Sequence, residues 1–129
     1  MATLCKGGAR LRDQVDHRWP KRDKRSDGWI GDTAHQARGK ASDHNPNKAG
    51  IVHAIDIDEN MGKRGKWRNG KAARKLTNQL LDYAASGLPG SNRLKYVVYE
   101  SRIASGSYKS SFWTWRSGSW GHEAHIHVS

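Results

Sequence analysis

The central segment of this chain is Ser42-Asp43-His44-Asn45-Pro46-Asn47-Lys48-Ala49-Gly50-Ile51-Val52-His53-Ala54-Ile55-Asp56-Ile57-Asp58. It places a histidine on a polar turn and then an aspartate on an apolar strand. A second segment, at the C-terminus, is Gly121-His122-Glu123-Ala124-His125-Ile126-His127-Val128-Ser129. Zinc binds imidazole nitrogens and carboxylate oxygens, and a catalytic zinc site uses three protein ligands and keeps one position open. The two segments together therefore predict a divalent metal site.

Strand geometry narrows the choice of ligands in the central segment. Successive side chains of a strand point to opposite faces, so Ala54, Asp56 and Asp58 share one face. The small side chain of Ala54 leaves room for a metal ion beside Asp56. His53 faces the other way on this template, which favours packing or solvent over metal binding.

The same alternation applies to the C-terminal strand, where Glu123, His125 and His127 share a face. The rise of a strand separates two imidazoles at this spacing by about 7 Å. Both can bind one ion, or one can be a ligand and the other a hydrogen-bonding neighbour. Strand geometry alone leaves both arrangements open.

These motifs resemble those of a known group of zinc peptidases. The matching residues are Ser42-x-His44, Gly50, Ala54-x-Asp56 and His122-x-x-His125-x-His127. The group contains lysostaphin, the D-Ala-D-Ala metallopeptidases and hedgehog, and the match is to its D-alanyl-D-alanine carboxypeptidase and L-alanyl-D-glutamate endopeptidase branch. The C-terminal residues also resemble catalytic domains of endolysins from phages of actinobacteria. The resemblance covers roughly residues 31 to 129 and implies Zn²⁺ held by His44, Asp56 and His127.

The general base is less clearly marked than the metal ligands. Carboxypeptidase-like members have an acidic residue three positions before the last ligand, where this chain has Ala124. The spacing of the histidines is instead similar to that of the penicillin-insensitive murein endopeptidases. We expect His125 to be the base, with Glu123 on the same strand face as the alternative. His122 matches the family spacing but lies on the wrong face of an ideal strand.

Three further residues are candidates for substrate binding. Gln36 matches a glutamine of the family by position. The family also has a substrate-binding arginine near this glutamine. This chain has no arginine in the expected place just upstream, so Arg38 is the candidate. Ser42 either hydrogen-bonds the substrate or pins the turn that carries His44. The family's gap between the histidine and aspartate ligands is shorter, so residues 45–52 should contain a loop insertion, for which Asn47 and Gly50 are suitable turn residues.

Composition limits the possible partners. The chain has 129 residues and a formal net charge of +11, so we expect a single peptidase domain over residues 1–129 that attracts polyanions. Nucleic acid is the usual partner at such a charge, and a basic metal-dependent nuclease or nucleic-acid-binding protein is the alternative function. The metal motif instead favours the anionic wall of a bacterium, and no ββα nuclease spacing is present. We therefore expect a zinc-dependent peptidase that cleaves peptidoglycan.

The termini and the cysteine count add expectations about compartment and assembly. No apolar segment has the length of a signal peptide or a membrane span. We expect synthesis in the host cytoplasm, action on the cell wall after release, and a monomer. Cys5 is the only cysteine, which excludes an intrachain disulfide and a cysteine-rich zinc site.

Hydrophobic periodicity predicts a small α+β fold. Helices are expected over residues 9–19, ended by Pro20, and from residue 69 or 70 to about residue 86. Strands are expected over residues 51–58 and 94–100, and residues 102–104 could either form a hairpin with the latter or continue it. The fold should be a mainly antiparallel sheet of about four strands, with helices on one face and the zinc site on the other.

Two remaining segments have competing interpretations. The basic run of residues 21–26 is expected to be a solvated loop rather than an anion-binding patch. Residues 105–121 carry several large aromatic side chains, which either form the wall of a cleft or complete a small core.

Overall fold

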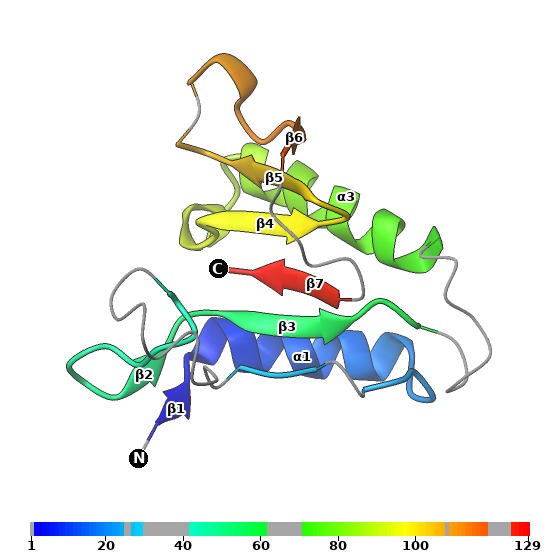
Figure 1. Ribbon diagram of the computed structural model, residues 1–129, viewed down its shortest axis with the longest axis vertical. Coiled ribbons are helices and arrows are strands. Elements are labelled where there is room, and N and C mark those ends of the chain that lie inside the picture. The colour runs from blue at the N-terminus through cyan, green and yellow to red at the C-terminus, as the bar shows by residue number, and fades with distance from the viewer. Residues whose placement is uncertain (1, 25–26, 30–41, 62–70, 108, 119–124) are drawn as a thin grey trace.

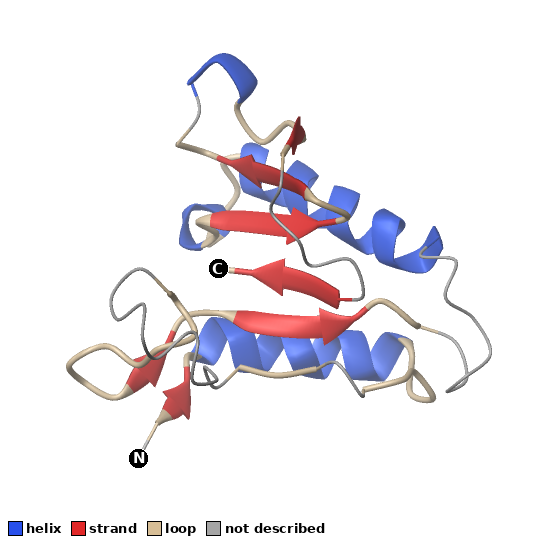
Figure 2. Ribbon diagram, in the orientation of Figure 1, coloured by secondary structure: helices blue, strands red, loops and turns tan. Residues whose placement is uncertain are grey.

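The computed structural model describes residues 2–24, 27–29, 42–61, 71–107, 109–118 and 125–129. Within these ranges the fold is α+β, with two α-helices and a five-stranded antiparallel sheet. The predicted α+β class with an antiparallel sheet is therefore confirmed, with five strands where about four were expected. Figure 1 shows the sheet with helices α1 (Lys6–Arg18) and α3 (Lys71–Ala85) behind or beside its strands, and Figure 2 shows the same view by secondary structure.

The sheet has the strand order β3-β7-β4-β5-β6. Its strands are β3 (Ile55–Asp58), β7 (His125–Val128), β4 (Tyr96–Tyr99), β5 (Arg102–Ser105) and β6 (Arg116–Ser117). The C-terminal strand β7 thus lies between β3 and β4, pairing antiparallel with both. This position brings the end of the chain against the strand that carries Asp56.

The two helices cover the apolar face of the sheet. They are α1 (Lys6–Arg18) and α3 (Lys71–Ala85), and they supply Val15, Ala73, Leu76, Leu81 and Ala84 to the buried core. From the sheet this core takes Ile55, Ile57, Val97, Tyr99, Ala104, Ile126 and Val128. Full burial of such aliphatic side chains stabilises the fold by about 1.5–3 kcal/mol each. By alternation, the residues between them on β3 and β7 point to the opposite face.

The first predicted strand is divided in two. β2 (Ile51–Val52) pairs parallel with β1 (Thr3–Leu4), whereas β3 pairs with β7. The chain therefore changes partner at residues 53–54. Sequence periodicity could not show this, because both halves are apolar.

Helix α1 begins at Lys6, three residues before the predicted start. Its two early glycines have poor helix propensity and hid this first turn. The sulfur of Cys5 accepts a hydrogen bond from the amide of Gly8 at 3.4 Å and caps the turn. A side chain at Gly8 would meet the side chain of Leu4 at 2.9 Å, so the glycine permits close packing there.

The basic run of residues 21–26 is not a solvated loop throughout, so that expectation was wrong. The structure describes residues 21–24 of this run. Arg22 is only 5% exposed and Asp23 is 1% exposed, whereas Lys21 and Lys24 are exposed. Nothing in the sequence of this basic run indicates that Arg22 and Asp23 are buried.

The aromatic segment divides between core and surface. Trp113 is buried in the core and Trp115 packs partly against it, whereas Phe112 is exposed. Of the two alternatives for residues 102–104, the structure has the hairpin, since β5 pairs antiparallel with β4. None of the helices in the described part of the chain is long and apolar enough to cross a bilayer.

Candidate metal centre

Strand pairing places two of the predicted ligands, Asp56 and His127, side by side. In the antiparallel pair of β3 and β7, Asp56 lies directly opposite His127. Side chains that face each other in this way are about 4.5–5.5 Å apart at their Cβ atoms. The Nδ1 atom of His127 is 3.1 Å from Oδ1 of Asp56.

The third predicted ligand comes from the loop before β2. The amide of Asn45 donates to the carbonyl of Ser42 at 3.1 Å and closes the turn that holds His44. Downstream, the side chain of Asn47 accepts hydrogen bonds from the amides of Ala49 and Ile51, and Gly50 has a φ of 76°. The segment before β2 is therefore a compact turn built on Asn47 and Gly50, the predicted turn residues.

The three side chains converge on a small buried site. Nε2 of His44 is 3.2 Å from Oδ2 of Asp56 and 3.2 Å from Nδ1 of His127. One potential ligand atom from each residue lies within 4.8 Å of the others. His44 and His127 are 3% and 4% exposed, so their donor atoms are shielded from bulk water. In the described part of the chain, this is the one group of its kind that could hold a metal ion.

A hydrogen bond on the far side of His44 sets the tautomer that a metal requires there. Nδ1 of His44 is 3.1 Å from the carbonyl oxygen of Trp29, which can only accept, so this nitrogen carries a proton. Nε2 is then the nitrogen that faces Asp56. In His127, Nδ1 faces Asp56 and Nε2 is 2.7 Å from Oγ of Ser129, a hydroxyl that can donate or accept and that holds the ring in place. Such outer hydrogen bonds are characteristic of metal-binding histidines.

Other groups pack around His127. The ring of Tyr96 stacks on it, with a centroid distance of 5.2 Å and an interplanar angle of 12°. Asp43 hydrogen-bonds Ser129 and pairs with Lys95, whose Nζ is 2.9 Å from Oδ2 of Asp43. Although burial alone would raise it, these contacts lower the pKa of Asp43. Asp43 therefore remains ionised next to the Ser129 hydroxyl, which in turn contacts His127.

The protonation of the three central groups is coupled. Burial would raise the pKa of Asp56, but hydrogen bonds from His127 and His44 lower it well below its ordinary value. Burial would likewise lower the pKa of His44, but the hydrogen bond and charge of Asp56 raise it. In His127, burial outweighs Asp56 and lowers the pKa. Asp56 is thus ionised, and His44 is the imidazole that retains a proton most readily.

The predicted base lies at the edge of the cluster. Nε2 of His125 is 3.5 Å from Oδ2 of Asp56, and His125 is more exposed than the other two histidines. An exposed imidazole next to the ligand atoms can exchange protons with water or a substrate. His53 points away, is exposed and lies 3.3 Å from the side-chain nitrogen of Asn47. His53 is not part of the group formed by His44, Asp56 and His127.

Several predicted residues lie outside the described part of the chain. They are the substrate candidates Gln36 and Arg38 and the alternative bases Glu123 and His122. Ser42 is described and is 6% exposed. Its backbone carbonyl closes the His44 turn, and both predicted roles of its side chain, pinning that turn or binding substrate, stay predictions.

Sequence reasoning missed the outer partners of the histidines. Ser129 is two residues after His127 and so shares its strand face, which is a usable signal. The carbonyl of Trp29 carries no such signal, because every residue has a backbone carbonyl. The ring of Tyr96 carries none either, because only the pairing of strands brings it next to His127.

The donor set fits a divalent metal ion. Two neutral imidazoles and one carboxylate are three protein ligands of the type found in catalytic zinc sites. The Trp29 carbonyl leaves Nε2 of His44 facing the site, Ser129 holds the ring of His127, and Asp56 carries the compensating negative charge. Comparisons of the chain with protein-family models, with curated proteins and with solved structures gave no match.

We expect metal affinity to fall as the pH is lowered. A metal ion must displace the proton of His44, and the raised pKa of this residue makes the competition begin at a higher pH than for a free imidazole. Below that pKa, affinity should fall about tenfold per pH unit for each proton displaced. Zn²⁺ titration against a competing chelator between pH 8 and pH 5 tests this. A constant affinity over this range would contradict the assignment of His44.

Replacement of Ser129 by alanine should weaken metal binding about tenfold, because loss of an outer hydrogen bond commonly costs 10- to 100-fold in affinity. The variant removes the hydroxyl that contacts Nε2 of His127 and so no longer fixes the orientation of this ring. Ser117→Ala is the matched control, since Ser117 is an exposed serine of the edge strand β6. Equal affinities of the two variants would show that Ser129 does not orient His127.

Proposed function

We propose that this protein is a zinc-dependent peptidase that cleaves peptide bonds in bacterial peptidoglycan. The observation that carries the proposal is the convergence of His44, Asp56 and His127, with the more exposed His125 beside them. This arrangement has three ligands and an adjacent acid–base group, which is the composition of a hydrolytic zinc site.

Zinc is the metal that best suits these donors. Imidazole and carboxylate ligands in a three-residue set are common to catalytic zinc sites, whereas Mg²⁺ and Ca²⁺ prefer oxygen ligands. When bound, zinc supplies Lewis acidity, which polarises a carbonyl group and lowers the pKa of water to about 7. His44 and His127 would hold it through Nε2 and Nδ1, with Asp56 as the anionic ligand.

The residues of the chain would supply the remaining chemistry. His125 would take a proton from the attacking water and later deliver it to the leaving amine. Its position 3.5 Å from Asp56 places it next to the ligands rather than in the core. The stacked Tyr96 and the Ser129 hydrogen bond would keep the ring of His127 in one orientation during the reaction.

The order of motifs supports peptidoglycan as the substrate. Their resemblance to the carboxypeptidase and endopeptidase branch points to peptides that contain D-amino acids. The bond would be the L-Ala-D-Glu bond of the stem or a related D-Ala bond. The net charge of +11 would attract the chain to an anionic wall.

The test is digestion of purified actinobacterial peptidoglycan with and without a metal chelator. Mass spectrometry of the newly formed amino and carboxyl ends would identify the bond. We expect release that the chelator stops and that added Zn²⁺ restores. A parallel incubation with DNA covers the alternative suggested by the charge. Intact peptidoglycan of several chemotypes together with cleaved DNA would overturn the peptidase in favour of a nuclease.

A further inference from the structure

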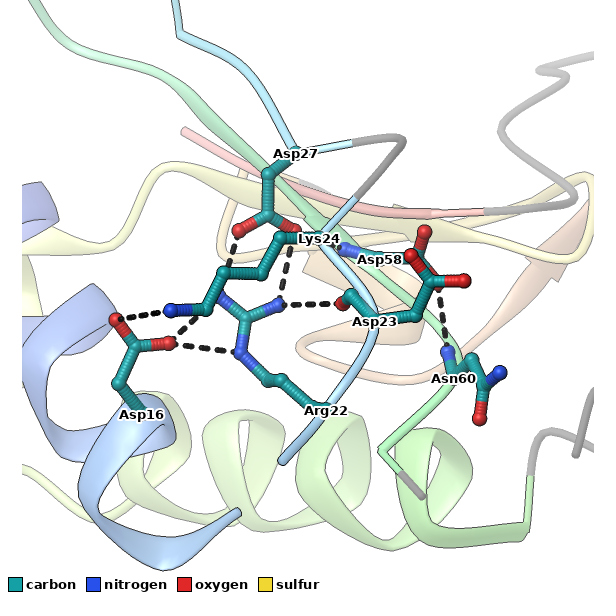
Figure 3. Close-up of polar contacts among 7 residues, drawn as sticks. All are labelled: Asp16, Arg22, Asp23, Lys24, Asp27, Asp58 and Asn60. Atoms are coloured by element: carbon teal, nitrogen blue, oxygen red, sulfur yellow. Dashed lines mark hydrogen bonds and ion pairs between the residues drawn. The ribbon is translucent and has the colours of Figure 1, made fainter. Parts of the chain in front are cut away.

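A buried arginine lies close to the strand that carries Asp56, although it contacts no metal ligand directly. The side chain of Arg22 is 0% exposed. Its Nε donates to Oδ1 of Asp16 at 2.8 Å, and its two terminal nitrogens bind the carboxylate of Asp27 at 2.9 and 2.6 Å. Figure 3 shows Arg22 between Asp16 on α1 and Asp27. The guanidinium therefore joins the helix to the segment that begins at Asp27.

Asp27 in turn contacts the ligand strand. Its Oδ1 accepts a hydrogen bond from the amide of Asp58 at 2.7 Å, two residues after Asp56. The same oxygen accepts from Arg22, so one carboxylate connects the buried guanidinium to the end of β3. Loss of Arg22 would leave Asp27 without the group that fixes its orientation.

The next two residues contact the predicted metal ligands themselves. Gly28 forms an antiparallel bridge with Asp56, with N–O distances of 2.7 and 3.1 Å. The carbonyl of Trp29 accepts from Nδ1 of His44. Residues 27–29, which we call the strut, thus bond successively to Asp58, Asp56 and His44. Two of the three predicted ligands depend on the place of this strut.

We propose that Arg22 is a positioning residue for the metal centre, acting through Asp27 and the strut on Asp56 and His44. The inference rests on the metal site of the proposed function but not on peptidase activity. Arginine suits this role because its planar fork binds a carboxylate with two parallel hydrogen bonds and so fixes orientation as well as distance. A lysine at this position would supply charge without the fork.

The alternative is that Arg22 only stabilises the fold, as buried ion pairs can. The two roles differ in what they do to folded protein. A structural role changes the fraction that is folded, whereas a positioning role changes the geometry and affinity of the metal site in molecules that remain folded. The test must therefore measure the metal site itself.

The variants are Arg22→Lys, Arg22→Gln and Asp27→Asn, measured at a temperature where circular dichroism shows each to be folded. Arg22→Lys keeps the charge and is the mildest change, so it serves if Arg22→Gln does not fold. The matched control is Arg74→Gln. Arg74 makes a comparable two-point contact with Glu100, at 2.7 and 3.0 Å, but on the exposed surface.

The readouts are Zn²⁺ affinity by chelator competition and the visible absorption spectrum of the Co²⁺-substituted protein. We expect the Arg22 and Asp27 variants to bind Zn²⁺ about tenfold more weakly and to have a changed Co²⁺ spectrum, with Arg74→Gln like wild type. The double variant Arg22→Gln/Asp27→Asn should bind no more weakly than the weaker single variant, because both act through one contact.

Each outcome has a distinct meaning. Wild-type affinity and spectrum in the folded Arg22 variants would overturn this inference alone. Failure of the wild-type chain to bind Zn²⁺ or Co²⁺ would overturn both the inference and the proposed function. Normal metal binding without cleavage of peptidoglycan would overturn the peptidase. The Zn²⁺ affinities and Co²⁺ spectra of the Arg22 variants would then still decide the positioning role.

Discussion

Replacement of His127 by alanine should abolish stoichiometric Zn²⁺ binding and lower peptidase activity about a thousandfold or more. His127 contributes one of three converging donors, and a catalytic zinc site needs three protein ligands. Loss of the Lewis acid removes several kcal/mol of transition-state stabilisation, and each 1.36 kcal/mol is a factor of ten in rate. The measurements are zinc content after dialysis and the rate of peptidoglycan cleavage.

His53→Ala is the matched control for this variant. His53 is also a histidine of the central segment, but it is exposed and points away from Asp56. We expect it to bind Zn²⁺ and to cleave peptidoglycan like wild type. Retained activity in His127→Ala, with His53→Ala inactive, would reverse the ligand assignment.

Replacement of His125 by alanine should lower the cleavage rate by about 10²–10⁴-fold, the usual contribution of a general base. Zinc affinity should stay within a few-fold of wild type, because His125 lies beside the cluster and not within it. Steady-state cleavage of a soluble peptidoglycan fragment and zinc titration of the same sample measure the two effects separately.

The result also separates the open alternatives for the base. Loss of zinc together with activity would show that His125 is a ligand. Unchanged activity in His125→Ala, with a large loss in Glu123→Gln, would transfer the role to Glu123. A loss confined to His122→Ala would favour the family spacing over strand geometry.

The resemblance to zinc peptidases named His44, Asp56 and His127 together, whereas strand alternation alone left the ligand set open. The structure brings these three side chains together, since Asp56 pairs directly with His127 where β3 and β7 are neighbours. Periodicity also located both α-helices, because their apolar residues recur at helical spacing. These are local properties, which a single sequence contains.

Contacts between distant segments were not predictable in the same way. The strand change at residues 53–54 depends on which partner each half finds, and both halves are equally apolar. Arg22 is buried because Asp16 and Asp27 converge on it from either side, which no pattern in the basic run indicates. The tautomer of His44 depends on a backbone carbonyl fifteen residues away in sequence.

The most direct test of the metal centre is anomalous X-ray diffraction at the zinc edge from crystals grown with Zn²⁺. We predict one strong peak about 2.0–2.2 Å from Nε2 of His44, a carboxylate oxygen of Asp56 and Nδ1 of His127. A peak on the opposite ring nitrogens, or no peak between these three side chains, would contradict the account.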